Sequence, residues 1–169
     1  MGISVFLVVA IVLLKTGIIK KFFEPKPGSC LILTENNCKK VKITEVKGYK
    51  VVMANLSKGT VLFSPISGHY NMVNFSVTGE VKDFGAIVDD SSINTTSYKS
   101  YAFVYSKLSE RKDSQDNIIK KGDQIGVIDG VKLNNFSEYN LVFSISQKNQ
   151  DNLTPVPLND VLLKMFANK

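Results

Sequence analysis

The chain has few imidazole and thiol side chains, the groups that most often bind zinc in proteins. There is one histidine, His69, and there are two cysteines, Cys30 and Cys38. Zinc needs three or four strong donors at fixed geometry, and a catalytic zinc site keeps one position open for water. Asp89 and Asp90 could join His69 as carboxylate donors, but no second imidazole exists. The sequence therefore predicts no metal site, and His69 is interpreted as an ordinary polar loop or surface residue.

Patterns of other catalytic classes are not found either. A Ser-His-Asp triad could draw on His69, but no G-x-S-x-G turn presents a serine nucleophile. Phosphate-binding loops of the types G-x-G-x-x-G and G-x-x-x-x-G-K do not occur. We therefore predict a protein that is not an enzyme and that uses no cofactor.

The two cysteines have two open interpretations. Cys30 and Cys38 enclose seven residues. In an oxidising compartment they could form a disulfide that closes a small loop around Thr34–Asn37. The alternative is a pair of free thiols. A cysteine-based metal site is not expected, because the chain offers too few further donors.

Short strands separated by turns account for most of the chain. Residues Val41–Val46 alternate apolar and polar side chains at a period of two, which is typical of a strand. Only Val156–Ala167 has a helical pattern, with a single apolar face. The fold class expected from many short strands is mainly β, a barrel or a sandwich. Further strands are predicted at Leu31–Leu33, Tyr49–Ala54, Thr60–Phe63, Asn71–Val77, Gly85–Val88, Tyr101–Tyr105, Gln124–Ile128 and Tyr139–Ile145.

The chain begins with an apolar segment. Ile3–Ile19 is 17 residues long and is interrupted only by Lys15. A membrane span needs about 17 residues or more, and Lys15 could extend its amine to the interface. A cleaved signal peptide is the alternative, but no basic residue precedes the segment and no A-x-A-like site follows it. We predict a single-pass anchor over residues 1–23 and a Pro-rich linker over 24–29. The anchor residues singled out are Ile3, Phe6, Leu7, Val8, Ile11 and Leu14.

The formal net charge of +6 is concentrated near this anchor. Residues 39–58 hold six lysines against one glutamate. We interpret residues 30–58 as a basic, membrane-proximal β segment that faces anionic headgroups. A solvated lysine-rich face is the alternative. Nucleic acid is not expected as a partner, because Tyr49 is the only aromatic residue among these lysines. The basic residues are Lys39, Lys40, Lys42, Lys47 and Lys50.

Five motifs follow one another in an order that resembles the LytM-type (M23) zinc peptidase domain. In that family a "V-x-x-G-D-x-I-G" turn precedes a "H-L-H-F-E-I" strand. The resemblance covers about residues 60–166 and implies a LytM-like β core, also described as a barrel-sandwich hybrid. Its motifs are Phe63–Gly68, Asp83–Val88, Ser100–Leu108, the pair Ile118–Ile128 and Tyr139–Ile145, and Leu153–Leu158.

The resemblance also implies a zinc site of two histidines and one aspartate, which this chain does not supply. The two histidine positions of the family's strand are occupied by Asn140 and Val142. Valine cannot bind zinc, and asparagine is a poor zinc ligand. His69 falls near the family's first ligand, and Asp89 or Asp90 would be a loose match for the aspartate. The implied domain, over residues 59–169, is a pseudoenzyme.

The leading hypothesis is a catalytically inactive, membrane-anchored scaffold or interaction module of the cell envelope. Its partners would be the bilayer, other envelope proteins, further copies of itself, or peptidoglycan bound without cleavage. Lysines after the span favour a cytoplasmic domain by the positive-inside rule, whereas the resemblance favours an extracytoplasmic one. We interpret the domain as extracytoplasmic, at the periplasm or cell surface.

Two alternatives belong to other functional classes. The first is a barrel-sandwich, lipoyl-like adaptor subunit of an envelope transport complex, which would share the Gly-Asp turn. An adaptor would normally add a long helical hairpin, and the sequence has no such periodic stretch. The second is a metallopeptidase that recruits the missing ligands from a partner chain.

Overall fold

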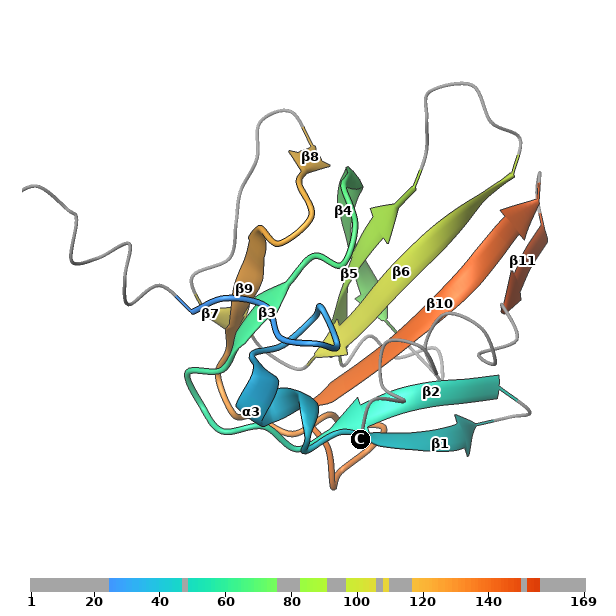
Figure 1. The fold of residues 1–169 in the computed structure, drawn as a ribbon. Helices are drawn as coiled ribbons and strands as arrows, with labels where there is room; N and C mark the ends of the chain where they lie inside the picture. Colours follow the sequence, from blue (N-terminus) through green and yellow to red (C-terminus); the bar gives the residue numbers. More distant parts are fainter. Residues whose placement is uncertain are drawn as a thin grey trace, which may run out of the picture.

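The fold is built from antiparallel strands arranged in two sheets (Figure 1). The computed structural model describes residues 25–46, 49–75, 83–90, 97–105, 108–109, 117–149 and 152–155. Every strand pairing among these residues is antiparallel. The predicted mainly β fold class is therefore confirmed.

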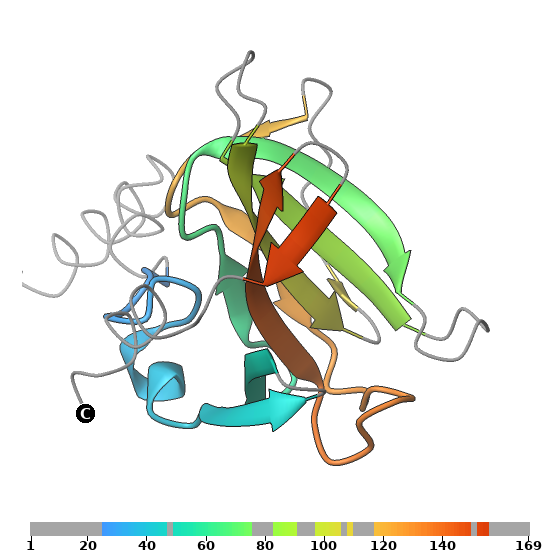
Figure 2. The ribbon, with the colours of Figure 1, turned by 90° about the vertical axis from the view of Figure 1, so that its right-hand side faces the viewer.

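The large sheet holds most of the strands. Its order is β1-β2-β10-β6-β5-β4-β8, and β11 pairs with β10 beside this path. Neighbours in the sheet are often distant in the chain, so the sheet can form only after long-range pairing. In Figure 2 the strand β4 arches across the other strands of the sheet. The bounds are β1 Lys42–Val46, β2 Tyr49–Ala54, β4 Gly68–Phe75, β5 Asp83–Asp89, β6 Ser97–Tyr105, β8 Ile118–Ile119, β10 Leu141–Asn149 and β11 Asn152–Pro155.

A small sheet covers one face of the large one. It has the order β3-β9-β7, with bounds Val61–Phe63, Gln124–Ile128 and Leu108–Ser109. Leu62 of β3 and Ile125 and Ile128 of β9 are buried in the same hydrophobic core as the inner side chains of the large sheet. The two sheets therefore bury one shared core, as the alternating apolar pattern requires.

The centre of this core is an aromatic pair on neighbouring strands. Phe103 of β6 and Phe143 of β10 are cross-strand partners, and both are fully buried. Their ring centroids lie 4.8 Å apart at a tilt of 48°, a favourable arrangement for aromatic pairs. Because side chains alternate along a strand, the odd-numbered residues of β6 and β10 face this core.

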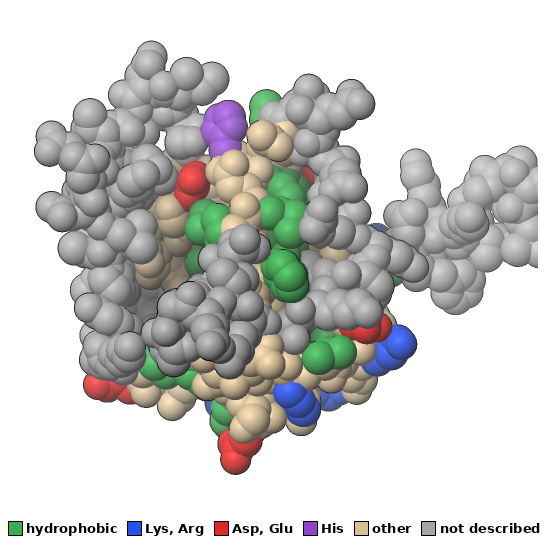
Figure 3. Space-filling model, turned by 180° about the vertical axis from the view of Figure 1, so that it is seen from behind, with side chains coloured by type: hydrophobic (Ala, Val, Ile, Leu, Met, Phe, Trp, Pro, Cys, Tyr) green, Lys and Arg blue, Asp and Glu red, His purple; other side chains and the backbone are tan. Residues whose placement is uncertain are grey.

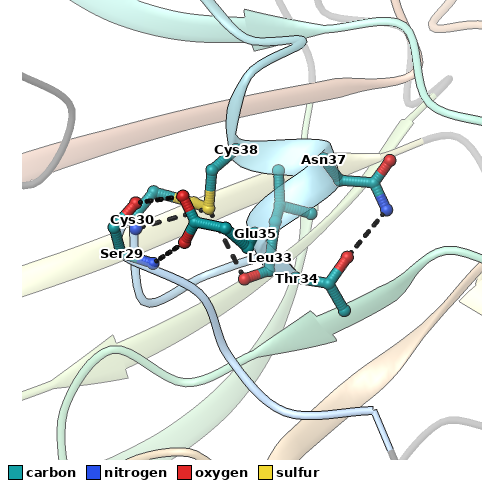
Figure 4. The surroundings of a disulfide bond; sticks show 7 residues. All are labelled: Ser29, Cys30, Leu33, Thr34, Glu35, Asn37 and Cys38. Atoms are coloured by element: carbon teal, nitrogen blue, oxygen red, sulfur yellow. Dashed lines mark hydrogen bonds between the residues drawn. A yellow bond between two sulfur atoms is a disulfide. The ribbon is translucent and has the colours of Figure 1, made fainter. Parts of the chain in front are cut away.

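The N-terminal part of the domain is a compact loop rather than the predicted strand at Leu31–Leu33 (Figure 4). Leu31 has a φ of 62°, which is incompatible with an extended strand. The N–H of Gly28 donates to the carbonyl of Leu33 at 2.6 Å and closes the loop. A Cβ at Gly28 would overlap the backbone of Glu35, so only glycine allows this approach.

A disulfide between Cys30 and Cys38 fixes this loop. Of the two interpretations of the cysteines, a disulfide or a pair of free thiols, the structure contains the disulfide. The second cysteine ends the short helix α3, Glu35–Cys38. Ile32 and Leu33 are fully buried, and the carbonyl of Ile32 accepts a hydrogen bond from the Phe63 N–H at 3.0 Å. The disulfide loop thus supplies apolar side chains to the core without adding a strand.

The predicted basic segment, residues 30–58, and the strands of residues 59–155 share one sheet. β1 and β2 belong to residues 30–58, and β2 pairs directly with β10 through Ala54, Met53 and Val52. Val52 and Ala54 are also members of the main core. The predicted segment 30–58 is therefore an integral part of the β domain.

Two predicted helices lie outside the described residues. These are the anchor, with its residues Ile3, Phe6, Leu7, Val8, Ile11 and Leu14, and the C-terminal helix at Val156–Ala167. Within the part of the chain that the structure describes, no helix has the length and apolar character needed to cross a bilayer.

The core predicts a sharp contrast between two phenylalanines. Phe103→Ala should lower the free energy of unfolding by about 3–5 kcal/mol, because it removes a fully buried ring from a packed pair. Phe84→Ala, at a side chain that is 44% exposed on β5, is the matched control and should cost much less. Urea denaturation of the full chain in mild detergent measures both. Equal losses would contradict the assignment of β6 to the centre of the core.

Candidate functional site

The candidate site lies on the face of the large sheet that points away from the main core, which we call the outer face. Cross-strand register places Met53, Val142, Val104 and Gly85 in one row across β2, β10, β6 and β5. Cross-strand partners project from the same side of a sheet. Val142, one of the two positions that the resemblance compares with zinc ligands, therefore lies on the outer face.

Val142 is surrounded by carbon atoms. Its side chain is buried and belongs to a separate hydrophobic cluster with Val51, Met53, Val104 and Leu133. Its two direct cross-strand neighbours are Met53 and Val104, neither of which is a zinc donor under ordinary conditions. The position that the resemblance assigns to a histidine is thus part of an apolar layer.

Asn140 has a structural task that uses its side chain fully. Its Oδ1 accepts a hydrogen bond from the Leu56 N–H at 2.8 Å, and its Nδ2 donates to the Leu56 carbonyl at 2.7 Å. Both residues are buried. An amide carries a donor and an acceptor side by side and can pair with one residue in this way, whereas the two nitrogens of an imidazole point apart. Asn140 therefore joins the end of β2 to the start of β10.

The loop of residues 129–139 covers the apolar layer of the outer face. Leu133 is almost completely buried in that layer, and Phe136 and Tyr139 pack against it. The Leu133 N–H donates a hydrogen bond to the Tyr139 carbonyl at 2.8 Å, which holds these two positions of the loop together. We call this segment the cover loop.

Asp83 holds the cover loop in place, and sequence reasoning gave it no role. Its carboxylate is fully buried and accepts hydrogen bonds from the Asn134 N–H at 3.0 Å and the Asn134 Nδ2 at 3.1 Å. A third bond comes from the Asn135 Nδ2 at 3.1 Å. In the sequence, Asp83 is only an acidic residue before an apolar segment, and Asn134 and Asn135 are only an Asn-Asn pair. The hydrogen bonds between them, seen in the structure, show that Asp83 holds the cover loop.

His69 and Asp89 meet at the other end of the outer face. They are cross-strand partners on β4 and β5, and a Cβ at Gly68 would overlap the Asp89 carbonyl. The Ser100 hydroxyl on β6 donates to Asp89 Oδ1 at 2.5 Å. Figure 3 shows the histidine projecting at the rim of the molecule, above apolar side chains.

The residues His69, Asp89 and Ser100 do not have the geometry of a catalytic triad. The carboxylate of Asp89, rather than the imidazole of His69, contacts the Ser100 hydroxyl. A triad needs the base between the nucleophile and the acid. β5 and β6 also separate His69 from Val142 on β10, so the structure does not bring the two candidate positions together. Among the described residues, no group of three His, Cys, Asp or Glu side chains is placed to hold a metal ion.

Asp90 lies just beyond β5 and is exposed. Its N–H donates to the Lys99 carbonyl at 2.9 Å. Burial, and to a smaller extent the negative charge of Asp90, raises the pKa of Tyr101 above its ordinary value of 10.0. Tyr101 is therefore neutral at physiological pH.

The disulfide loop has its own electrostatic contact. The Ser29 N–H donates to Glu35 Oε2 at 2.6 Å, and the Ser29 hydroxyl donates to Oε1 at 3.1 Å (Figure 4). These two hydrogen bonds, with a smaller contribution from Lys39, lower the pKa of Glu35 below its usual value of 4.5. The charged carboxylate thus fastens α3 to the residue next to Cys30.

Three of the predicted basic residues are exposed lysines: Lys39 and Lys40 follow α3, and Lys42 begins β1. Lys47 lies outside the described residues. Lys50 is part of β2, and its side chain is not described.

Comparison of the chain with protein-family models, with curated proteins and with solved structures finds no match.

The Asn140 contact predicts a large loss of stability on truncation. Asn140→Ala leaves the buried N–H and carbonyl of Leu56 without partners, at roughly 1–3 kcal/mol for each group. The exposed Asn71 on β4 is the matched control, and Asn71→Ala should change stability by less than about 0.5 kcal/mol. Denaturation curves of the two variants test this. Similar curves would show that Asn140 does not join β2 to β10.

The Ser29 contact predicts a measurable titration. In the native protein the Glu35 pKa should lie below 4.5. In Ser29→Ala the pKa should rise only part of the way, because the stronger backbone hydrogen bond remains. Since the folded pKa is lowered, the stabilisation is present above the unfolded pKa and is lost as pH falls through the folded value. NMR titration of the Glu35 side chain gives both values, and an unchanged pKa in Ser29→Ala would refute the hydroxyl contact.

Proposed function

We propose that this chain is a catalytically inactive, membrane-anchored LytM-like domain that serves as a structural or interaction module of a cell-envelope assembly. The observation that carries the proposal is the environment of Val142. The position that would hold a zinc-binding histidine is buried between Met53 and Val104 and is covered by Leu133. A metal ion placed there would meet hydrocarbon in place of donor atoms.

Asn140 supports the same proposal from the neighbouring position. Its amide is fully engaged in pairing with Leu56. Both positions of the family strand therefore contribute to stability in this domain. In the proposed function, a β core of this kind acts by presenting surfaces to a partner, without the groups that would carry out hydrolysis.

The disulfide supports an extracytoplasmic location for the domain. Disulfides persist in oxidising compartments such as the periplasm and the cell surface. Cys30 and Cys38 are both buried, and their bond shapes the loop that feeds Ile32 and Leu33 into the core. A domain that depends on this loop is suited to the outer side of the membrane, with the apolar segment Ile3–Ile19 as its anchor.

Partner binding would use the surfaces that the fold leaves at its margins. Among the described strands, β1 is the outermost strand of the large sheet on one side. Strand addition at such an edge is a common mode of recognition. The outer face beyond the cover loop offers the half-buried side chains of Ile87, Ala102 and Ser144. Envelope proteins, further copies of the chain, and peptidoglycan bound without cleavage are the proposed partners.

The proposal predicts the behaviour of the full chain isolated from membranes. Elemental analysis should find far less than one zinc ion per chain, and intact sacculi should release no fragments when incubated with the protein. The tagged chain should migrate in a large envelope complex on native gels. One zinc per chain together with hydrolysis would establish a peptidase instead. Recovery with a transporter and an outer-membrane channel would establish an adaptor.

A further inference from the structure

The linker enters the domain between two segments that are distant in the sequence. Gly122, in the turn before β9, lies against Pro27, since a Cβ at Gly122 would be 3.8 Å from Pro27 Cγ. On the side of the disulfide loop, Gly28 packs against the backbone of Glu35 at the start of α3. The tertiary structure therefore brings the β8–β9 turn and the disulfide loop to the point where the linker joins the domain.

Both segments carry exposed lysine pairs. Lys120 and Lys121 directly precede Gly122, and Lys39 and Lys40 directly follow α3. Lys39 is close enough to Glu35 to contribute to its lowered pKa. With the exposed Lys26 of the linker, these residues form a set that we call the lysine collar: Lys26, Lys39, Lys40, Lys120 and Lys121.

Among the described residues, two carboxylates lie close in the chain to these lysines, and both already have partners. Glu35 accepts hydrogen bonds from Ser29. Asp123 Oδ2 accepts one from the Lys120 N–H at 3.0 Å, and Lys121 is held through its N–H by the Ser67 hydroxyl at 2.9 Å. Five lysines against two carboxylates leave the collar strongly positive.

The linker keeps the collar close to the anchor. Lys26 follows Ile19, the last residue of the apolar segment, by seven positions. A chain spans at most about 3.6 Å per residue, so Lys26 stays within about 25 Å of the end of the anchor. Pro25 and Pro27 further restrict the linker. The length of the linker therefore keeps Lys26, and the segments packed beside the linker, close to the proposed anchor.

We propose that the lysine collar binds anionic phospholipid headgroups and so fixes the orientation of the domain on the membrane. The inference rests on the membrane anchor of the proposed function and extends it to Lys120 and Lys121, which belong to a remote part of the chain. Each lysine near an anionic bilayer raises the affinity for the membrane by about fivefold. Docking by the collar turns the opposite end of the domain toward its partners.

The test is protection of lysines from an amine-labelling reagent, read by mass spectrometry. The full chain is reconstituted into nanodiscs of phosphatidylcholine alone or with one third phosphatidylglycerol. The collar lysines should be labelled at least three times more slowly in the anionic discs, and high salt should remove the difference. Lys58, whose side chain is 76% exposed and pairs with Asp129 at 3.2 Å, is the internal control and should be labelled equally in both.

A pair of variants separates local docking from total charge. Lys120→Gln with Lys121→Gln should abolish most of the protection at Lys39 and Lys40. Lys58→Gln with Lys132→Gln removes the same charge elsewhere and should leave that protection intact. Equal labelling of the collar in both kinds of disc would overturn the proposal.

Two further outcomes identify other failures. If alkaline carbonate removes the chain from the lipid, the chain has no membrane anchor. That result would overturn the proposed function as well as the collar. An inserted chain without lipid-dependent protection overturns the collar alone. Protection by single-stranded DNA in neutral discs, with none from phosphatidylglycerol, would also overturn the proposal and indicate a nucleic-acid partner.

Discussion

The register between β6 and β10 determines which side chains of these two central strands face the main core and which face the outer side of the sheet. Phe143 pairs with Phe103 and faces the main core, so Val142 must pair with Val104 and face the other way. A shift by one residue would move the phenylalanines out of the core. The contact between the two tilted rings, with centroids 4.8 Å apart, makes that shift costly, and the faces of the sheet are fixed as a result.

The outer face has two ends with different chemistry because of this register. At one end, Met53, Val104 and Val142 form an apolar layer closed by the cover loop. At the other end, Asp89 binds the Ser100 hydroxyl beside His69. The two ends differ because the hydrogen bonds of the buried Asp83 hold the cover loop over the apolar end only. A domain built in this way has a closed apolar layer around Val142, the position that the proposed resemblance assigns to a metal ligand.

The disulfide loop links the fold to its proposed surroundings. It buries Ile32 and Leu33 in the core, and it places Lys39 and Lys40 beside the linker. Because the same loop also packs against residues 27 and 28, loss of the Cys30–Cys38 bond would disturb the core and this side of the domain together. The basic segment is thus a structural part of the domain, and its lysines are carried by elements that pack on the β core.

Much of the strand pattern follows from the sequence alone. Alternation of apolar and polar side chains at a period of two located β1, and short apolar segments bounded by turn residues located β2, β9 and the centre of β10. The sequence likewise determined that Val142 has no metal-binding atoms and that the cysteines could pair. It failed at Leu31–Leu33, where a loop closed by the disulfide and by Gly28 replaced the expected strand.

Only the tertiary structure decided which distant residues meet. The contacts of Asp83 with Asn134, and of Asn140 with Leu56, join residues more than fifty positions apart. The same holds for the approach of Gly122 to Pro27. Local propensity contains no information on such contacts, since they depend on the order in which antiparallel strands pair. Composition and periodicity therefore determined that this protein is mainly β, and the pairing of the strands decided what its polar residues do.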